Sequence, residues 1–441
     1  MNTAVETHAK DELAHKALRF LTAGSVDDGK STLIGRLLFD SRAILSDQLD
    51  ALEKRAAGEP IDLSLLTDGL EAEREQGITI DVAYRYFATK TRKFIIADAP
   101  GHEQYTRNMV TAAAGSDAAV VLVDITKIDW KASPVPLLAQ TRRHSLLAQL
   151  LRVPSIVFAI NKLDAIEDGT ETAFNNVKAS LEAFAAQAGI VSKGVIPVSA
   201  LRGDNVTTPS ANWPWYQGPT LLQVLEELPV TDESHEGALL HPVQYVTRDS
   251  VGEGEATASG TGHQYRTFWG RIAHGCVKAG DEVQIFPSGE SAIVSEVRHA
   301  AEVVTSCEAG QSAGIVLDRQ VDISRGDWIH TPGSIKPTAE FSATLAWLDT
   351  EPAVVGRKYW VRHGNRWVQA RITAIDSRLD IHTLADQDAH ELAVNEIGRV
   401  QIQTQQPLPV EDYLDNRISG ALIVVDPTTN RTSGALLVKA A

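Results

Sequence analysis

The segment from Gly24 to Ser31 places two glycines, a lysine and a serine at a spacing that suits a bound phosphate. It reads GSVDDGKS and fits the pattern G-x-x-x-x-G-K-S/T. The glycines let the backbone wrap around a phosphate, Lys30 can reach the β and γ oxygens, and the Ser31 hydroxyl can bind Mg²⁺. Such a loop needs a strand before it and a helix after it. The apolar run ending at Ala23 and the helical pattern of Thr32–Phe39 are typical of those two elements.

The second candidate segment is Asp98–His102, which reads DAPGH and follows the apolar run Phe94–Ala97. A carboxylate at the end of a strand can hold the Mg²⁺ shell, and the amide of Gly101 can contact a γ-phosphate. An Asp-x-x-Gly pattern alone is a common turn. Its position after a phosphate loop favours the functional interpretation.

A base-recognition segment is predicted at Asn161–Asp164, which reads NKLD and follows the apolar run Ser155–Ile160. The Asp164 carboxylate can accept hydrogen bonds from N1 and N2 of guanine, which adenine does not offer. The segment therefore favours GTP over ATP. The tetrapeptide Thr126–Asp129 reads TKID and resembles it, but Thr replaces Asn and the position is too early, so we interpret it as a lookalike.

Two further segments complete the expected site. Ser199–Leu201 follows the apolar run Gly194–Val198 and could offer a backbone amide to guanine O6. Glu73–Ile80 reads EREQGITI, and as a mobile loop it could place the Thr79 hydroxyl on Mg²⁺ and close over the γ-phosphate. The predicted metal ligands are Ser31, Thr79 and Asp98. The predicted GTP-binding residues are Gly24, Ser25, Val26, Asp27, Asp28, Gly29, Lys30, Ser31, Thr32, Asp98, Ala99, Pro100, Gly101, His102, Asn161, Lys162, Leu163, Asp164, Ser199, Ala200 and Leu201.

The elements that must position these segments follow from hydrophobic periodicity. From Leu18 to about Leu228, short apolar runs alternate with amphipathic helical patterns, which predicts a parallel sheet covered on both faces. Beyond the polar stretch Thr231–Gly237, short alternating strands with Gly, Pro and Asp turns indicate antiparallel barrels. Expected strands there are Arg271–Ala273, Asp281–Phe286, Ser291–Val297, Glu340–Leu348, Trp367–Ala374 and Gly420–Val425.

The fold class expected is therefore a P-loop α/β domain with a parallel-core sheet, followed by two antiparallel β-barrels. The domain limits predicted are 1–235, 236–333 and 334–441. A chain of 441 residues is long enough for several cores.

Composition narrows the class of protein. The formal net charge of -16 argues against a general grip on nucleic acid, although a local basic patch is compatible with it. Two cysteines do not make a disulfide framework. The first 19 residues carry no apolar run typical of a signal peptide, and no stretch is long and apolar enough to span a membrane. We therefore expect a cytoplasmic protein with no nucleic-acid or membrane partner.

The motifs in this order resemble those of the translation-factor superfamily of GTPases, which includes elongation factor Tu. Arg74–Ile80 resembles the first switch of that superfamily, and Asp98–His102 with Asn108-Met109 resembles the second. The resemblance implies that His102 positions the attacking water, between an apolar gate of Val26 and Ile78. Together with Lys30, these are the predicted catalytic residues.

A closer resemblance is to the family of large, GTP-hydrolysing subunits of bacterial sulfate adenylyltransferase. It is carried by GSVDDGKS in the loop, by Ser31–Leu38 with Asp40-Ser41, by Gln140–Ser145, and by segments around Trp215 and Asp322. It implies GTP and Mg²⁺ as cofactors and a small, ATP-pyrophosphatase-like subunit as partner. The implied function is to couple GTP hydrolysis to formation of adenosine 5'-phosphosulfate and pyrophosphate in sulfate assimilation.

The superfamily resemblance also permits a second function. This alternative is a translation GTPase that delivers aminoacyl-tRNA to the ribosome. Two stretches, Asp124–Ala139 and Val251–Phe268, depart from the family pattern without touching the nucleotide motifs. The pattern G-x-x-x-x-G-K-S/T occurs once, so we do not expect the adenylylsulfate kinase that is fused to some relatives.

Overall fold

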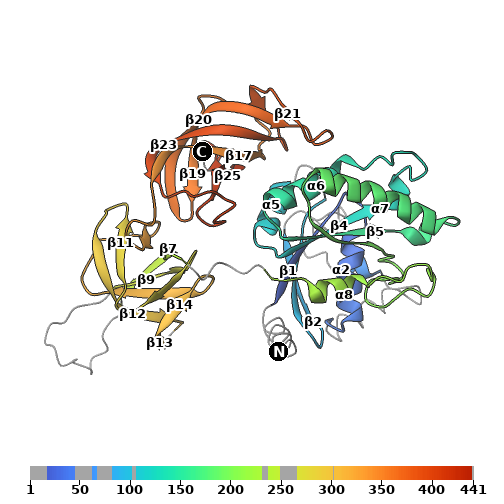
Figure 1. Cartoon of the computed structure of the whole chain (residues 1–441), viewed down its shortest axis with the longest axis horizontal. Coiled ribbons are helices and arrows are strands. Elements are labelled where there is room, and N and C mark those ends of the chain that lie inside the picture. Colours follow the sequence, from blue (N-terminus) through green and yellow to red (C-terminus); the bar gives the residue numbers. More distant parts are fainter. Residues whose placement is uncertain are drawn as a thin grey trace. The chain divides into compact units, whose positions relative to one another are not determined.

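The computed structural model describes residues 17–44, 62–66, 82–101, 106–230, 237–248, 266–300 and 302–439. The chain divides into two compact units (Figure 1). The first is Met1–Thr231 with Asp380–Ala385, and the second is Asp232–Leu379 with Asp386–Ala441. Each unit is described below by itself.

The first unit is built on one six-stranded sheet. All neighbouring strands are parallel except the edge pair β2–β3, which is antiparallel. The expected parallel-core sheet is therefore confirmed, with an antiparallel edge strand that the apolar runs did not predict. In sheet order the strands are β2 (Ala83–Ala88), β3 (Lys93–Asp98), β1 (Leu18–Ala23), β4 (Ala118–Asp124), β5 (Ser155–Asn161) and β6 (Ser192–Pro197).

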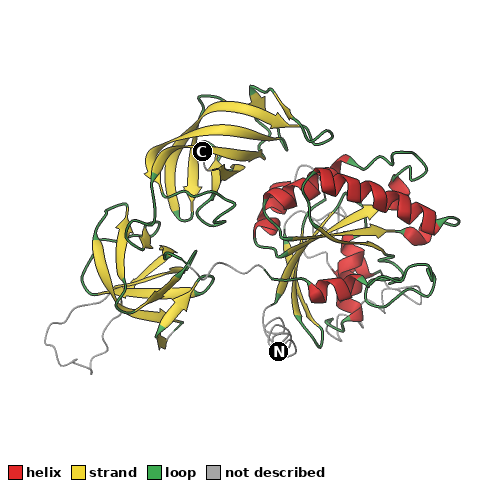
Figure 2. Ribbon diagram, in the orientation of Figure 1, coloured by secondary structure: helices red, strands yellow, loops and turns green. Residues whose placement is uncertain are grey.

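Helices cover both faces of this sheet, with α6 and α7 on one side and α2 and α8 on the other (Figures 1 and 2). Every residue of β4 and β5 is buried, as expected of central strands between two helical layers. A fully buried Val, Leu or Ile side chain contributes roughly 1.5–3 kcal/mol, so these strands are a rigid base for the loops that follow them. The helices are α2 (Lys30–Asp40), α5 (Thr106–Ala114), α6 (Ala139–Leu150), α7 (Thr170–Gln187) and α8 (Leu221–Glu227), and the short 3-10 turns are η1 (Leu63–Leu66), η3 (Ile125–Lys127) and η4 (Leu163–Ala165).

The second unit is all-β and antiparallel, as expected. In its first part, alternate residues of the long strands point into a core of aliphatic side chains. The strand expected at Arg271–Ala273 is wrong in its limits. Strand β9 ends at Arg271 and begins at Arg266, inside the stretch Val251–Phe268 that departs from the family pattern. The strands are β7 (Leu240–Pro242), β8 (Tyr245–Arg248), β9 (Arg266–Arg271), β10 (Cys276–Lys278), β11 (Glu282–Phe286), β12 (Ser291–His299), β13 (Glu302–Val304), β14 (Ser306–Glu308), β15 (Ser312–Leu317) and β16 (Trp328–His330).

The other part of this unit is a closed barrel. Strands β19, β24, β25, β17, β23 and β20 pair in that order, and the β19–β20 pairing returns to the start. Closure removes free sheet edges. The strands are β17 (Thr338–Trp347), β18 (Ala353–Val354), β19 (Lys358–His363), β20 (Arg366–Leu379), β21 (Asp386–Gln387), β22 (Glu391–Leu392), β23 (Ile397–Leu408), β24 (Ala421–Val425) and β25 (Thr432–Lys439). We propose that the two barrels are separate domains with a boundary near residue 333; that division stays a prediction.

An aromatic stack links the two barrels within this unit. The rings of Trp328 and His363 lie parallel, with their centroids 5.0 Å apart. Both side chains are buried, and Nε2 of His363 lies 2.8 Å from the carbonyl oxygen of Ser419. Burial lowers the pKa of His363 to about 4, so the ring is neutral at physiological pH.

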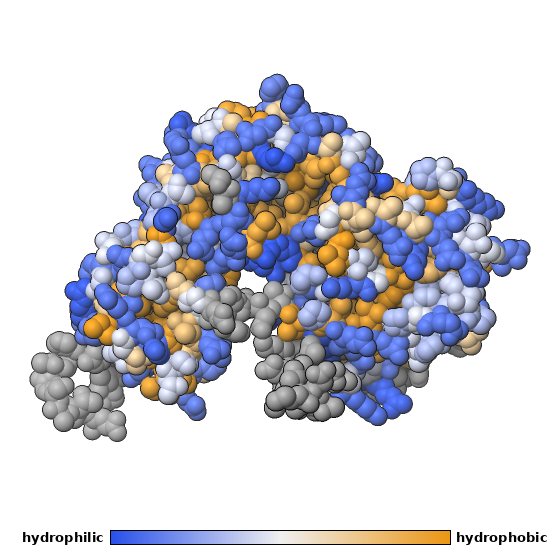
Figure 3. All heavy atoms as spheres, in the orientation of Figure 1, coloured by the Kyte–Doolittle hydropathy of each residue, from blue (hydrophilic) through white to orange (hydrophobic). Residues whose placement is uncertain are grey.

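The mostly hydrophilic surface and the two free thiols are typical of a globular protein. Hydrophilic side chains cover most of the face shown in Figure 3. Cys276 and Cys307 are both free thiols. Among the residues that the structure describes, no helix combines the length and apolarity needed to cross a membrane.

Candidate nucleotide-binding site

The predicted loops lie together because four of them follow strands of one sheet at the same edge. The phosphate loop follows β1, Asp98 ends β3, Asn161 ends β5, and Ser199–Leu201 comes shortly after β6. These strands run in the same direction, so their carboxyl ends share an edge of the sheet, where open α/β sheets bind ligands. The arrangement brings together most of the residues predicted from sequence.

The phosphate loop has the strained turn that its glycines predict. Asp27 and Gly29 have φ angles of 60° and 91°, in the left-handed region. A side chain at Gly29 would collide with the amide nitrogen of Asn161, so glycine is required there for two reasons. Lys30 begins helix α2, so Gly29 and the first residues of that helix present backbone amides to the loop.

The side chain of Lys30 lies inside the phosphate loop. Its Nζ donates to the carbonyl oxygens of Gly24 (3.0 Å) and Ser25 (2.8 Å), and the residue is 7% exposed. Burial lowers the pKa of Lys30, while the nearby carboxylates of Asp98 and Asp28 act in the opposite direction. The ammonium therefore lies against the backbone of the predicted phosphate loop.

The segment after β3 closes on the phosphate loop. The Asp98 carboxylate is buried and accepts a hydrogen bond from the Thr22 hydroxyl at 3.3 Å, since the two residues are paired across β1 and β3. A side chain at Gly101 would meet Nζ of Lys30 and the carbonyl of Gly24. The second predicted segment therefore lies directly against the first.

Asn161 joins the phosphate loop to the segment after β6. Its Nδ2 donates to the carbonyl oxygen of Asp28 at 2.8 Å, and its Oδ1 accepts from the backbone amide of Ala200 at 3.0 Å. Asn161 is buried, so both amide contacts are shielded from water. One side chain thus sets the spacing between the phosphate end and the base end of the site.

The base end is braced by two arginines. Asp164 lies in the turn η4, and its carboxylate is 3.4 Å from Nε of Arg202. Arg36 of α2 donates to the carbonyl oxygens of Ala200 (3.3 Å) and Leu201 (2.5 Å). Arg202 belongs to no predicted motif, and Arg36 lies in Ser31–Leu38, a segment that carries the family resemblance but was given no contact. Both contacts join segments that are far apart in the chain.

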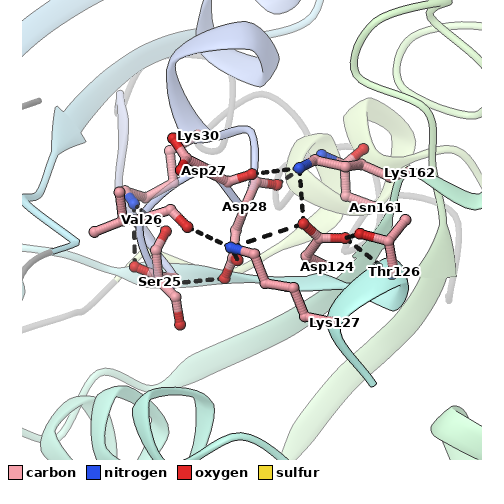
Figure 4. Close-up of polar contacts among 11 residues, drawn as sticks. Ser25, Val26, Asp27, Asp28, Lys30, Asp124, Thr126, Lys127, Asn161 and Lys162 are labelled. Carbon is pink, nitrogen blue, oxygen red and sulfur yellow. Dashed lines mark hydrogen bonds and ion pairs between the residues drawn. The ribbon is translucent and has the colours of Figure 1, made fainter. Parts of the chain in front are cut away.

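The sequence motifs do not mark a second set of charged residues beside the phosphate loop. Asp124, the last residue of β4, accepts from Lys162 Nζ at 2.7 Å and from the amide and hydroxyl of Thr126 (Figure 4). Burial would raise the pKa of Asp124, but the hydrogen bonds from Lys162 and Thr126 outweigh it and hold that pKa below its usual value. Lys127, in the segment interpreted as a lookalike, contacts Asp28. The signal in the sequence that could have indicated these contacts is Asp124, an acidic residue at the end of an apolar strand.

Three predicted residues lie outside the described residues: His102, Ile78 and Thr79. The other members of the predicted metal set can be examined for the donors that Mg²⁺ prefers. Mg²⁺ sites in nucleotide enzymes use one or two carboxylates with phosphate oxygens and water. Asp98 supplies a buried carboxylate and Ser31 a hydroxyl in the first turn of α2. In the described part of the chain no group of three or more His, Cys, Asp or Glu could hold a metal.

Comparisons with known proteins agree with this geometry. The family model for the elongation factor Tu GTP binding domain matches residues 15–231, and the model for the GTP-eEF1A C-terminal domain-like family matches residues 340–439. GTP is therefore the ligand of the first unit.

Relatives that are similar over nearly the whole chain identify a narrower family than the two family models do. The chain is 42% identical to sulfate adenylyltransferase subunit 1 of Laribacter hongkongensis, over 96% of this chain and 85% of the relative. It is 43% identical to sulfate adenylyltransferase subunit 1 of Cellvibrio japonicus, over 98% of this chain and 87% of the relative. It is also 44% identical to the bifunctional enzyme CysN/CysC of Mycobacterium tuberculosis, over 94% of this chain and 66% of the relative. The chain therefore belongs to the sulfate adenylyltransferase subunit 1 family, within the GTPase superfamily of elongation factor Tu.

Proposed function

We propose that this chain is the GTP-hydrolysing subunit of a heteromeric sulfate adenylyltransferase. The complex joins ATP and sulfate into adenosine 5'-phosphosulfate and pyrophosphate, and this chain converts GTP and water into GDP and phosphate to drive that uphill step. The observation that carries the proposal is that Lys30, Asp98 and Asn161 lie together at one edge of the sheet. The chain that holds them is similar over nearly its full length to proteins named sulfate adenylyltransferase subunit 1.

The residues would divide the work as follows. Lys30 and the amides of the phosphate loop bind the phosphates, Asp164 and the segment Ser199–Leu201 bind guanine, and Ser31, Asp98 and Thr79 would hold Mg²⁺. A metal bound there would neutralise charge that builds up on the transferring phosphoryl group. His102 orients the attacking water, and Val26 with Ile78 forms an apolar gate beside it. Positioning and charge stabilisation account for most of the catalysis of phosphoryl transfer, so few side chains are needed.

The partner in this proposal is a small, ATP-pyrophosphatase-like subunit that holds ATP and sulfate. The relatives are named subunit 1, which supports a heteromeric complex. We place the complex in the cytoplasm. Delivery of aminoacyl-tRNA, the alternative, has less support, because relatives that are more than 40% identical carry the sulfate adenylyltransferase name.

The test is a titration of this chain with the small subunit. GTP turnover, followed as phosphate release, is expected to rise when the small subunit, ATP and sulfate are all present, and pyrophosphate release is expected to require GTP. In a parallel titration, ribosomes programmed with messenger RNA replace the small subunit. Turnover that stays flat with the small subunit but rises with ribosomes would overturn the assignment.

A further inference from the structure

Beneath the phosphate loop, two carboxylates and two ammonium groups alternate in one chain of contacts (Figure 4). Lys127 Nζ lies 2.9 Å from Asp28 Oδ1 and 3.8 Å from Asp124 Oδ2, and Lys162 Nζ lies 2.7 Å from the same oxygen of Asp124. Both carboxylate side chains are 0% exposed, whereas the lysines are 35% and 36% exposed. The lysines therefore stand between buried negative charge and solvent.

Asp28 uses both of its oxygens within this arrangement. Oδ1 accepts from Lys127, and Oδ2 accepts from the backbone amide of Ser25 at 2.6 Å. A buried carboxylate without a positive partner is costly, so the conformation of Asp28 depends on Lys127. Through Asp28, Lys127 therefore fixes the start of the phosphate loop.

Lys127 also contacts the loop directly. Its Nζ donates to the carbonyl oxygen of Val26 at 2.5 Å. Lys162 makes the matching contact one residue later, to the carbonyl oxygen of Asp27 at 2.5 Å. Two consecutive carbonyls of the phosphate loop are thus each held by an ammonium group from a different loop.

The fold explains how Lys127 arrives there. β1 and β4 are parallel neighbours, so the loops that follow them lie side by side. Asp124 caps the turn η3 by accepting from the amide and hydroxyl of Thr126, and this turn carries Lys127 back over the sheet edge. The pairing with Asp28 joins residues 99 positions apart.

We propose that Lys127 is a positioning residue that holds the phosphate loop in its nucleotide-binding shape and so sets how fast nucleotide leaves. The inference rests on the proposed GTP site and adds a residue outside every nucleotide motif. A loop held in the bound conformation beforehand loses less entropy on binding. Loss of Lys127 would leave the Oδ1 atom of Asp28 buried without its ammonium partner, and the loop would rearrange to hydrate this oxygen.

The test is the dissociation rate of a fluorescent GDP from full-length protein, chased with excess GDP. Lys127→Met is expected to speed release about tenfold, the scale of one hydrogen bond to a charged group. Lys127→Arg, which keeps the charge and donors, is expected to restore much of the slow release. The matched control is Lys131→Met, in the same loop, whose ammonium lies over the ring of Trp130 rather than against the phosphate loop.

A second variant separates positioning from general stability. Adding Asp28→Asn to Lys127→Met is expected to slow release again, because the amide oxygen can still accept from Ser25 and no charge is left unpaired. A change that only loosened the fold would lower the melting temperature of each variant and would not be reversed by the second substitution. Equal release from Lys127→Met and wild type, with GDP bound by both, would overturn this inference alone. Failure of wild type and Lys131→Met to bind GDP would overturn the GTP site and this inference with it.

Discussion

Three histidines buried in the barrels and two aspartates buried at the edge of the parallel sheet satisfy their polar groups in different ways. In the barrels, His241, His330 and His363 each place a ring nitrogen against a backbone carbonyl oxygen, at 3.3, 2.8 and 2.8 Å. Burial lowers the pKa of His241 and His363 to about 4, so these rings carry no charge. At the edge of the sheet, Asp28 of the phosphate loop and Asp124 of β4 are fully buried and paired with lysines from other loops.

The contrast separates two uses of buried polarity. A neutral group bonded to a nearby backbone atom adds to stability and leaves chemistry unaffected. Charges paired across several loops are costly to bury, and they fix the relative positions of those loops. We therefore expect substitutions at the sheet edge to change nucleotide handling and substitutions between the barrels to change stability.

The largest effect is expected from His102→Ala. The proposed role of His102 is to orient the attacking water, so GTP binding should persist while hydrolysis falls by about a hundredfold or more. Single-turnover phosphate release and fluorescent-GTP titration measure the two separately. His299→Ala, an exposed histidine of β12, is the control. Hydrolysis at the wild-type rate would remove His102 from the mechanism.

Trp328→Ala tests the expectation that substitutions between the barrels change stability. Removing a fully buried tryptophan that stacks on His363 is expected to cost about 3–5 kcal/mol of unfolding free energy. GTP binding by the first unit should be retained below the unfolding transition. Urea unfolding with Trp367→Ala as the control checks this, because Trp367 is 49% exposed. Equal stability of the two variants would contradict a structural role for the stack.

The smallest of the three effects is expected from Asp164→Asn. Guanine loses a charged acceptor, so GTP should bind about ten- to a hundredfold more weakly. Xanthosine triphosphate should gain affinity, because xanthine carries an oxygen where guanine carries its amino group. Competition binding of the two nucleotides measures the switch, with the exposed Asp168→Asn in the same loop as control. An unchanged preference for guanine would show that another residue selects the base.

The accuracy of prediction followed burial. The predicted apolar run Ser155–Ile160 matches β5 to within one residue, because the seven positions of this strand are all buried and leave a continuous apolar run. Edge strand β2 was missed, since Tyr84 and Tyr86 are exposed and no apolar run marks it. At Arg271–Ala273 the apolar pair follows the end of β9, which shows how weakly short barrel strands are marked.

The site shows the same limit in another form. Segments with internal motifs, such as Gly24–Ser31 and Asn161–Asp164, were predicted because each carries its chemistry within a few residues. Lys127 and Arg202 act by pairing with distant residues, Asp28 and Asp164. Those pairs depend on the order of strands in the sheet, which a single sequence does not state.

Asn161 has a consequence for redesign of the pocket. Its amide is committed at both ends, to the Asp28 carbonyl and to the Ala200 amide. Aspartate there would lose the donor, and leucine would lose donor and acceptor together. A protein engineer who wants a different nucleobase would therefore start from Asp164, the proposed base reader, because any change at Asn161 alters the contacts to the phosphate loop and to Ala200 at once.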